Sequence, residues 1–267
     1  MRGYQHVRAH PALSQVIAGF SQRQFDNAQA LPVALPARTD LFLEFYLGEP
    51  YRVRRDGSTG TAPVIALVAP HTHPGTELLI QGHVDTFTVH FTPTACHRLF
   101  GCDLKALRDR AVLASDALGL SILKLHSALQ AARSFTARLA LAQAYFESHL
   151  VRARPADAID LAAQVLASAQ LPVRVSQLAE QAGCSERQLS RVFTQRTGLP
   201  PKLYSRLARF QALLTTHQRQ PSLPLAQLAH AAHYFDQAHF IRDCREFTAR
   251  SPQDFLRHWM PADRIVG

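Results

Sequence analysis

An internal repeat in the last third of the chain constrains its fold more than any other feature. The segment QLAEQAGCSERQLSRVFTQRTGLPP begins at Gln177, and the related segment QLAHAAHYFDQAHFIRDCREFTARSP begins fifty residues later at Gln227. Further along the repeat the offset becomes fifty-one, as between Arg191 and Arg242. The second copy therefore carries one extra residue in its turn, and the chain contains two units of one design.

Each copy has the pattern of a helix-turn-helix unit. In the first copy Leu178 faces inward from a short helix, and Gly183 suits a turn that requires a positive φ. We expect Ser185 and Asp236 to be the N-caps of the second helix in the first and second copy. Gly198 is expected to end that helix in the first copy as a left-handed C-cap.

The second helix of each copy has an apolar face and a polar face. The apolar residues, which we expect to be buried, are Leu189, Val192 and Phe193 in the first copy and Phe240, Cys244 and Phe247 in the second. The polar face holds Glu186, Arg187, Ser190, Arg191, Thr194 and Gln195 in the first copy and Gln237, Ala238, His239, Arg242 and Arg245 in the second. Arginine bound to guanine is the commonest specific contact in the major groove. Most exposed helical faces are only solvated, but two capped copies in tandem favour a DNA-reading function.

The segment between the two copies is predicted to be one long helix. Residues 201–217 place an apolar residue on one face at each turn, as at Leu203, Leu207 and Leu214. At 1.5 Å per residue this helix is about 25 Å long. Used as a rigid spacer, it could hold the two recognition helices about one DNA turn, roughly 34 Å, apart.

The charge of the chain indicates a polyanionic partner. The net charge is +9, and the pI is about 9.9. From Leu171 onward there are 13 Lys and Arg against 7 Asp and Glu, a net charge of +6, whereas the first 170 residues have 16 against 13, a net charge of +3. A surplus of this kind favours nucleic acid over a membrane as the partner. The candidate phosphate contacts are Arg196, Lys202, Arg206, Arg209 and Arg245.

Residues from about Leu171 to Trp259 resemble the DNA-binding domain of AraC/XylS-type transcriptional regulators. The segments LAEQAGCSERQLSRVFTQRTGLPPKLY and DQAHFIRDCREFTARSPQDF carry the resemblance. It implies a fold of seven helices in two subdomains that binds double-stranded promoter DNA, with RNA polymerase as a further partner. The base-reading residues that it implies are Arg187, Ser190 and Arg191 in the first recognition helix and Gln237, Ala238, His239 and Arg242 in the second.

The chain departs from the family pattern at three positions of the second copy. His233 occupies the turn position where the family prefers glycine, Cys244 replaces the usual phenylalanine, and Ala249 replaces the closing glycine. Histidine adopts the left-handed region more readily than most residues, and cysteine packs as a small apolar group, so each departure can be accommodated.

The chain up to about Phe91 has the pattern of β-strands. Residues 41–47 and 64–69 are short apolar runs, and Pro and Gly clusters separate such runs from one another. Within residues 85–91 the faces alternate, with Phe87, Val89 and Phe91 on one side and Thr86, Thr88 and His90 on the other. These patterns predict an antiparallel sandwich or barrel.

Two helices are expected between Ser134 and Ala169. Residues 135–150 carry an apolar stripe at helical spacing, and the next helix is expected to have Pro155 in its first turn. The stripe could form a dimer interface or an interdomain brace, and internal packing is the commoner use of such a stripe.

The first 130 residues resemble, more weakly, the N-terminal domain of a subset of AraC-type regulators, through LPARTDLFLEFYLG and HFTPTACHRLFG. In the family this domain usually senses a ligand, mediates dimerisation, or both, often as a cupin-like β-structure. We therefore predict an α+β chain that binds an unknown small-molecule effector and no cofactor, with a homodimer as one option. The expected parts are a β-rich sensor domain at 1–130, linker helices at 131–169, and a DNA-binding domain at 170–260 with its first helix-turn-helix at 175–198, connecting helix at 201–217 and second helix-turn-helix at 224–249.

The segment HTHPGTE raises a different hypothesis. His71, His73 and Glu77, with a later histidine, could be ligands of a metal in a cupin-like enzyme or metal sensor. Pro74 and Gly75, however, predict a turn that breaks the extended backbone such a ligand pair needs. We expect a loop beside an effector pocket, and the metal site remains the alternative.

The remaining features favour a regulator in the cytoplasm rather than an enzyme. There is no run of eighteen apolar residues and no apolar N-terminal segment of the kind a signal peptide has. The four cysteines have no CxxC spacing, so we expect reduced thiols without structural zinc.

Overall fold

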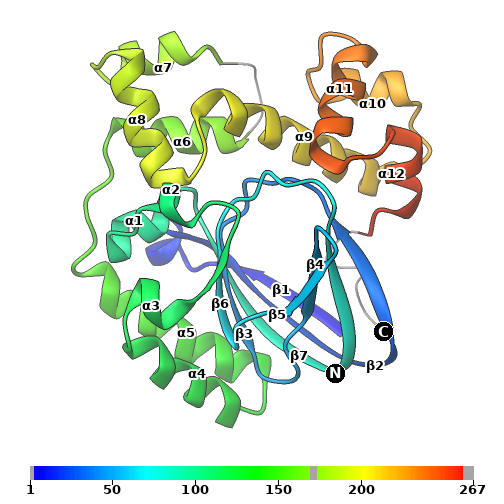
Figure 1. Ribbon diagram of the computed structural model, residues 1–267. Helices are drawn as coiled ribbons and strands as arrows, with labels where there is room; N and C mark the ends of the chain where they lie inside the picture. Colours follow the sequence, from blue (N-terminus) through cyan, green and yellow to red (C-terminus); the bar gives the residue numbers. More distant parts are fainter. Residues whose placement is uncertain (1–2, 169–172, 261–267) are drawn as a thin grey trace.

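The computed structural model describes residues 3–168 and 173–260, in which a curved β-sheet lies beneath a layer of helices (Figure 1). The sheet and helices α1 to α5 come from residues 3–150, and helices α6 to α12 above the open side of the sheet come from residues 158–258. The domain boundary that we expect at residues 169/170 lies outside the described residues. Within the described ranges, no helix is both long and apolar enough to cross a membrane.

The N-terminal sheet has eight strands, all paired antiparallel, as the sequence predicts. The strands are β1 (Gly3–Arg8), β2 (Ile17–Leu35), β3 (Phe42–Tyr46), β4 (Arg52–Arg55), β5 (Ser58–Thr61), β6 (Ile65–Val68), β7 (Thr76–Phe91) and β8 (Ala111–Leu113). The order is β1-β2-β7-β3-β6-β8, and β4 pairs with both β5 and β7. The structure is thus one curved sheet, closer to an open barrel than to a sandwich of two sheets.

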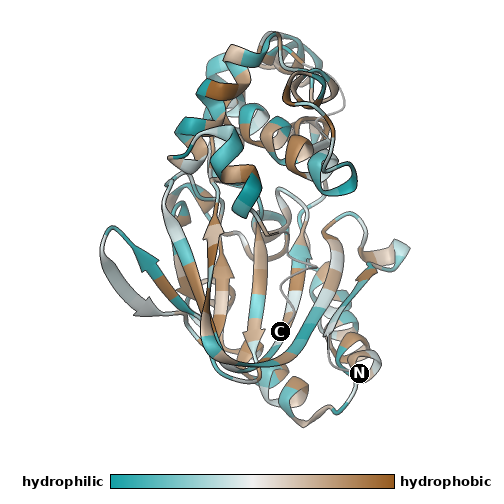
Figure 2. Cartoon of the chain, turned by 90° about the vertical axis from the view of Figure 1, so that its right-hand side faces the viewer, coloured by the Kyte–Doolittle hydropathy of each residue, from teal (hydrophilic) through white to brown (hydrophobic). Residues whose placement is uncertain are grey.

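The curvature comes from the two longest strands. Strands β2 and β7 pair from Ile17 with Phe91 to Leu35 with Thr76, with irregularities in register near both Ile17 and Asn27. Irregularities of this kind bend a strand. One half of β7 pairs with β3 and the other half with β4, so the sheet wraps around an interior space. Hydrophilic positions interrupt the largely hydrophobic central strands (Figure 2).

The predicted alternation along β7 is confirmed, and it separates two faces of the sheet. Phe87 and Val89 are fully buried in the main N-terminal core. Thr88 faces the other way and is paired across the strands with Glu44 of β3 and Ser21 of β2. Burial of the phenyl and isopropyl groups stabilises the fold by about 1.5–3 kcal/mol each, whereas the opposite face collects polar groups.

The helical elements up to residue 168 are divided between two cores. They are the 3₁₀ turn η1 (Pro11–Leu13), which precedes β2, and α1 (Ala95–Phe100), α2 (Leu104–Leu107), α3 (Ala114–Leu118), α4 (Ser121–Ala131), α5 (Phe135–Leu150) and α6 (Ala158–Ser168). The apolar stripe of α5, with Ala142 and Phe146, packs into the same core as the sheet. Helix α6 instead packs on α8 and α9 and joins the C-terminal core.

The start of α6 corrects one prediction. The helix begins at Ala158, so Pro155 precedes it and is not in its first turn. Asp157 caps the helix instead, because its carboxylate accepts the backbone N–H groups of Ile159 at 2.9 Å and Asp160 at 3.1 Å.

The C-terminal region is helical throughout its described residues. Its elements after α6 are α7 (Val175–Gln181), α8 (Glu186–Thr197), α9 (Pro201–Arg219), α10 (Leu225–Ala231), α11 (Gln237–Thr248) and α12 (Pro252–His258). Helix α9 extends two residues beyond the predicted end and is about 28 Å long. Phe210 on α9 packs against Phe240, Phe247 and Phe255, with ring centroids 5.6–6.4 Å apart. Between residues 173 and 260 the described chain holds six of the seven helices that the resemblance implies. The seventh helix of this core is α6, which the sequence pattern predicts as a linker helix.

Candidate nucleic-acid interface

Both recognition helices, α8 and α11, begin at the N-caps that the sequence predicts. The Ser185 Oγ accepts the backbone N–H of Gln188 at 3.2 Å, and the Asp236 carboxylate accepts that of His239 at 2.6 Å. Each cap satisfies a backbone donor that the first turn of a helix leaves unpaired. The two helices therefore start at equivalent positions of the repeat.

The turns of the two units have the same backbone but different residues. In the first unit Gly183 has a φ of +62° before the recognition helix, and Gly198 has a φ of +82° after it. In the second unit His233, at +60°, and Ala249, at +57°, adopt the same left-handed conformation. The predicted turn and C-cap positions are confirmed, and the second unit reaches them without glycine.

The seven residues implied to read bases lie on the outward faces of α8 and α11. Five are exposed, namely Arg187, Arg191, Gln237, Ala238 and Arg242, and the other two, Ser190 and His239, are partly buried. The ring of His239 contacts that of Tyr234, with centroids 5.1 Å apart, and its Nε2 lies 3.9 Å from the carboxylate of Asp243. Its orientation is therefore set by the protein.

Among the five candidate phosphate contacts, Lys202 and Arg245 are exposed. The guanidinium of Arg209 lies over the ring of Tyr234, 4.9 Å from its centroid, and is half-buried. Lys202 stands at the second position of α9 and Arg245 in the last turn of α11.

The assignment of Arg196 as a phosphate contact is corrected by its position in the structure. Its guanidinium donates to Asp157 at 2.6 and 2.8 Å and to Asp160 at 3.1 Å, and 15% of its side chain is exposed. The hydrogen bonds from Arg196 lower the pKa of the Asp157 carboxyl to about 2. Arg196 thus ties α8 to α6 and has no free face for a phosphate.

Arg206 is corrected for the same reason. Its guanidinium donates to Asp243 at 2.7 Å and to Glu246 at 2.6 Å and lies 5.0 Å from the ring centroid of Phe247. The bond to Glu246 raises the pKa of Arg206 above its usual value. Arg206 therefore joins α9 to α11 and positions the second recognition helix.

An exposed phenylalanine beside the second recognition helix did not emerge from the sequence as a candidate. Phe235 directly precedes the N-cap Asp236, and 93% of its surface is exposed. Cys184 of the first unit corresponds to Tyr234, since the N–H of each bonds the carbonyl of the residue five positions earlier, so Phe235 is the extra residue of the second turn. Only the structure distinguishes Phe235 from its buried neighbour Tyr234, because both are aromatic residues in one turn.

The candidate metal ligands His71, His73 and Glu77 are not brought together. Glu77 is bonded to Arg54 and lies 3.9 Å from Arg250, while His71 is buried and burial lowers its pKa to about 3. In the described part of the chain, no group of three or more His, Cys, Asp or Glu side chains could hold a metal ion. The predicted turn is confirmed, since Pro74 and Gly75 form it.

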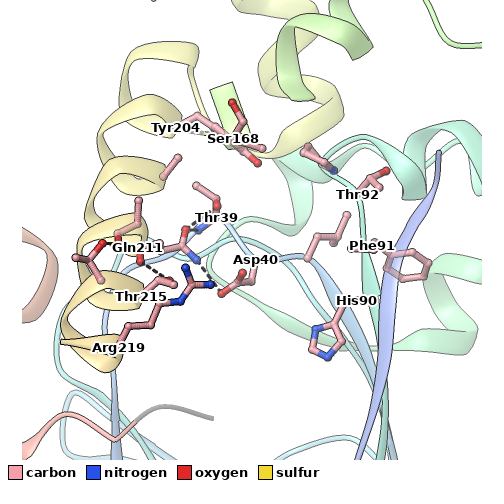
Figure 3. A pocket seen from close by; sticks show the side chains of 17 residues that line it. Thr39, Asp40, His90, Phe91, Thr92, Ser168, Tyr204, Gln211, Thr215 and Arg219 are labelled. Carbon is pink, nitrogen blue, oxygen red and sulfur yellow. Dashed lines mark hydrogen bonds between the residues drawn. The ribbon is translucent and has the colours of Figure 1, made fainter. Parts of the chain in front are cut away.

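The segment between β2 and β3, residues 36–41, connects the sheet to the second helix-turn-helix unit. The N–H of Ala37 donates to the carbonyl of Phe247 in α11 at 2.8 Å, and Ala37 is fully buried in the C-terminal core. The N–H and Oγ1 of Thr39 donate to Oε1 of Gln211 at 3.0 and 2.6 Å, and Gln211 donates to Asp40 at 3.0 Å (Figure 3). No local pattern in the sequence predicts this contact.

A cavity of about 620 Å³ lies beside these hydrogen bonds, between the sheet and α9. Thr39, Asp40 and His90 line one side, and Gln211 and Arg219 lie opposite on α9 (Figure 3). Burial lowers the pKa of His90 to about 4, so its imidazole is neutral at physiological pH. The interface between the two halves is therefore only partly filled by side chains.

Comparisons with known proteins agree with this architecture. Residues 178–258 match the family model described as a helix-turn-helix domain. The crystal structure of an apo ToxT variant from Vibrio cholerae is similar, with a TM-score of 0.50 and 10% identity, over 90% of this chain and 98% of that chain. A second ToxT structure from Vibrio cholerae has a TM-score of 0.50 and 8% identity, over 91% of this chain and 99% of that chain. No curated protein has a significantly similar sequence.

Proposed function

We propose that this chain is an AraC-type transcriptional regulator that reads two successive major grooves of promoter DNA with α8 and α11. The match of its C-terminal part to a helix-turn-helix domain supports this proposal. One observation carries the proposal: two capped recognition helices with exposed polar faces are joined by the single helix α9. A spacer of about 28 Å suits helices that enter the major groove at points roughly 34 Å apart.

Base reading is assigned to the outward residues of both helices. In α8 these are Arg187, Ser190 and Arg191, and in α11 they are Gln237, Ala238, His239 and Arg242. Arginine can bind guanine through two hydrogen bonds, and glutamine can do so with adenine. The exposed positions of Arg187 and Arg191 in α8, and of Arg242 in α11, support this assignment.

Lys202 and Arg245 are proposed to bind phosphates, which fix the register of the protein on DNA without reading its sequence. Their exposure supports this role.

Phe235 is proposed to contact a thymine methyl group at the edge of the second site, because an apolar side chain can recognise that methyl group in the major groove.

We also propose that the N-terminal domain controls DNA binding through residues 36–41. This segment holds α9 through Gln211 and α11 through Phe247, so a change in its conformation would move the second recognition helix relative to the first. RNA polymerase and a second copy of the chain are proposed partners on the family resemblance alone.

The test uses the full-length protein and a library of random duplex DNA, from which the preferred sites are selected. Footprinting on a selected site should protect two major-groove segments about one helical turn apart on one face of the duplex. The exposed Arg133, remote from both recognition helices, gives the control variant Arg133→Ala, which should keep the wild-type footprint. A single protected segment, or binding without sequence preference, would overturn the two-groove proposal.

A further inference from the structure

Two cysteines without a role in the proposed function lie in contact at the end of α1. Cys96 is in the first turn of this helix, and Cys102 follows Gly101, which ends it with a φ of +73°. The left-handed turn brings the chain back onto the helix, so that the N–H of Cys102 donates to the carbonyl of Cys96 at 3.3 Å. The thiol of Cys96 also donates a hydrogen bond to the sulfur of Cys102. Both are free thiols in the structure, and their sulfurs are neighbours.

The surroundings of the pair do not form a metal site. Zinc in a structural site takes four ligands. The described residues bring together no group of three or more His, Cys, Asp or Glu side chains that could hold an ion. The adjacent His97 is already bonded, because its Nε2 accepts from Arg154 at 3.1 Å and its Nδ1 donates to the carbonyl of Cys102 at 3.3 Å. The chemistry that remains for two thiols in contact is oxidation to a disulfide.

The two thiols differ in acidity and in exposure. The bond from Cys96 lowers the pKa of the Cys102 thiol, whereas burial raises the pKa of Cys96 well above its usual value. Cys102 is also the one that reaches the surface, with 8% of its area exposed against 0% for Cys96. Because the thiolate is the nucleophile, Cys102 is the residue that attacks an oxidant. Its small exposed area admits a small hydroperoxide and excludes a bulky disulfide.

We infer that Cys96 and Cys102 are a redox-active dithiol, which a hydroperoxide oxidises to a disulfide and a dithiol reductant restores. The Cys102 thiolate attacks the terminal oxygen of the hydroperoxide and the O–O bond breaks. The products are a sulfenic acid on Cys102 and an alkoxide or hydroxide, which takes up a proton. The sulfur of Cys96 then attacks the sulfur of Cys102, and its proton leaves with the displaced hydroxide as water. The two thiols lose two electrons in total, and the hydroperoxide gains them.

Closure of this disulfide changes the structure around Cys102. The two sulfurs must approach to about 2.05 Å, which is shorter than any hydrogen bond. Cys96 belongs to α1 and is fully buried, whereas Cys102 lies beyond the helix, so the movement falls on Cys102. Oxidation also removes the thiol hydrogen that Cys102 donates to the carbonyl of Ala117 in α3 at 3.5 Å.

The movement reaches the first recognition helix because α2 begins directly after Cys102. Asp103 is the N-cap of α2, and α2 packs against α8. The contact is close, since a Cβ on Gly198, the C-cap of α8, would lie 3.1 Å from the carbonyl oxygen of Leu104 in α2. A shift of Cys102 therefore displaces the end of α8. This effect on DNA rests on the proposed function of α8, whereas formation of the disulfide does not.

Peptide mapping of the full-length wild-type protein tests the disulfide without any substitution. The reduced protein is treated with hydrogen peroxide, denatured, alkylated with N-ethylmaleimide and digested with trypsin. Trypsin cleaves after Arg98, between the two cysteines, so the disulfide should join the peptide that ends at Arg98 to residues 99–105. Dithiothreitol should separate the two peptides. Full alkylation of all four cysteines, or a disulfide that instead involves Cys184 or Cys244, would overturn the inference.

Two single variants test the order of the two steps. Cys96→Ala removes the second thiol, so oxidation should stop at a sulfenic acid on Cys102, which dimedone labels. Cys102→Ala removes the attacking thiolate, so the buried Cys96 should gain no label. Cys184→Ala, at a partly buried cysteine in the turn before α8, is the control and should form the disulfide as the wild type does. Labelling of Cys96 in Cys102→Ala would overturn the assignment of Cys102 as the attacking thiol.

A DNA measurement distinguishes this inference from the proposed function. Formation of the disulfide should change the affinity of the wild-type protein for a selected DNA site by about fivefold or more, the lower end of ordinary allosteric coupling, and dithiothreitol should restore it. Cys102→Ala, treated with the same peroxide, should keep its affinity. A complete disulfide with unchanged DNA affinity would overturn the connection to α8 and leave the dithiol standing. Failure of the reduced protein to select any DNA would instead contradict the proposed function.

Discussion

The two helix-turn-helix units share one design but are held in place differently. In the first, both left-handed positions are glycines, and Arg196 anchors the recognition helix to α6 through Asp157. In the second, His233 and Ala249 take the left-handed positions, and the recognition helix is bonded to the N-terminal segment through Ala37. A non-glycine residue in this conformation costs about 1–2 kcal/mol. The second unit is therefore the strained one. The N-terminal domain contacts both units, the first through α2 against α8 and the second through residues 36–41.

The largest expected effect tests whether both units read DNA. Arg191→Ala and Arg242→Ala should each weaken binding to a selected site by about 1–3 kcal/mol and relax preference at one base pair, because each removes a contact to a base edge. Competition assays with single-base variants of the site measure this. If only one variant loses its preference at a base pair, the helix-turn-helix unit of the other variant contacts DNA without reading its sequence. The control Arg133→Ala should change neither the affinity nor the base preference.

A matched pair of substitutions tests the difference in backbone strain. Gly198→Ala should lower the free energy of unfolding by about 1–2 kcal/mol, because the residue has a φ of +82° and a new Cβ would lie 3.1 Å from the carbonyl oxygen of Leu104. Ala249→Gly, at the equivalent position of the second unit, should raise it by up to about 1 kcal/mol. Chemical denaturation measures both. If both substitutions change the free energy of unfolding in the same direction, the two C-caps do not differ in backbone strain.

The third prediction concerns Phe235. The turn of the first unit has no exposed aromatic residue that corresponds to it. Phe235→Ala should weaken binding to a selected site by about 0.8 kcal/mol, the value of one buried methyl group. Replacing each thymine of the site with uracil, which lacks the methyl, should identify one position where wild-type binding falls and Phe235→Ala binding does not. Leu120→Ala, at another exposed apolar residue, is the control. If every thymine replacement affects both proteins equally, Phe235 does not contact a methyl group.

The fourth prediction uses pH to probe the anchor of the first unit. The pKa of Asp157 falls from its unfolded value, near 4, to about 2 in the folded protein, because Arg196 bonds its carboxylate. The stabilisation is therefore present above about pH 4 and is lost as the pH falls from 4 to 2. Unfolding midpoints of the wild type should decline more steeply in this range than those of Asp157→Asn. Parallel pH profiles of the two proteins would mean that this ion pair adds no pH-dependent stability.

The smallest effect is expected from the phosphate contact at the start of α9. Lys202→Ala should weaken binding to all DNA sequences alike and reduce the slope of log affinity against log salt concentration by about one. Lys124→Ala, at an exposed position on α4, should leave the slope unchanged. An unaltered slope in Lys202→Ala would remove Lys202 from the phosphate contacts.

The features that the sequence predicted correctly depend on residues close together in the chain. The caps Ser185 and Asp236 bond atoms three residues away, and the left-handed turns follow from Gly183 and Gly198. The alternation along β7 is equally local. The start of α6 was misjudged because proline and aspartate can each begin a helix, and here Asp157 does so.

The errors about the candidate site have a different origin. Arg196 and Lys202 are both basic residues near the end of the first unit, and no local pattern separates them. Arg196 meets Asp157, 39 residues away, and Arg206 meets Asp243, 37 residues away, so both are ion-paired. The sequence supplies the number of cations, and the folded chain decides which of them remain free for DNA.

By itself, the sequence determined that this chain carries two capped helix-turn-helix units on a common helix after a β-rich region, because periodicity, caps and turns depend on local interactions. Only the tertiary structure decided which arginines are free and that residues 36–41 contact the second unit. The bond between Thr39 and Gln211 spans 172 residues. Contacts of that range arise from packing of whole elements, which no short stretch of sequence specifies.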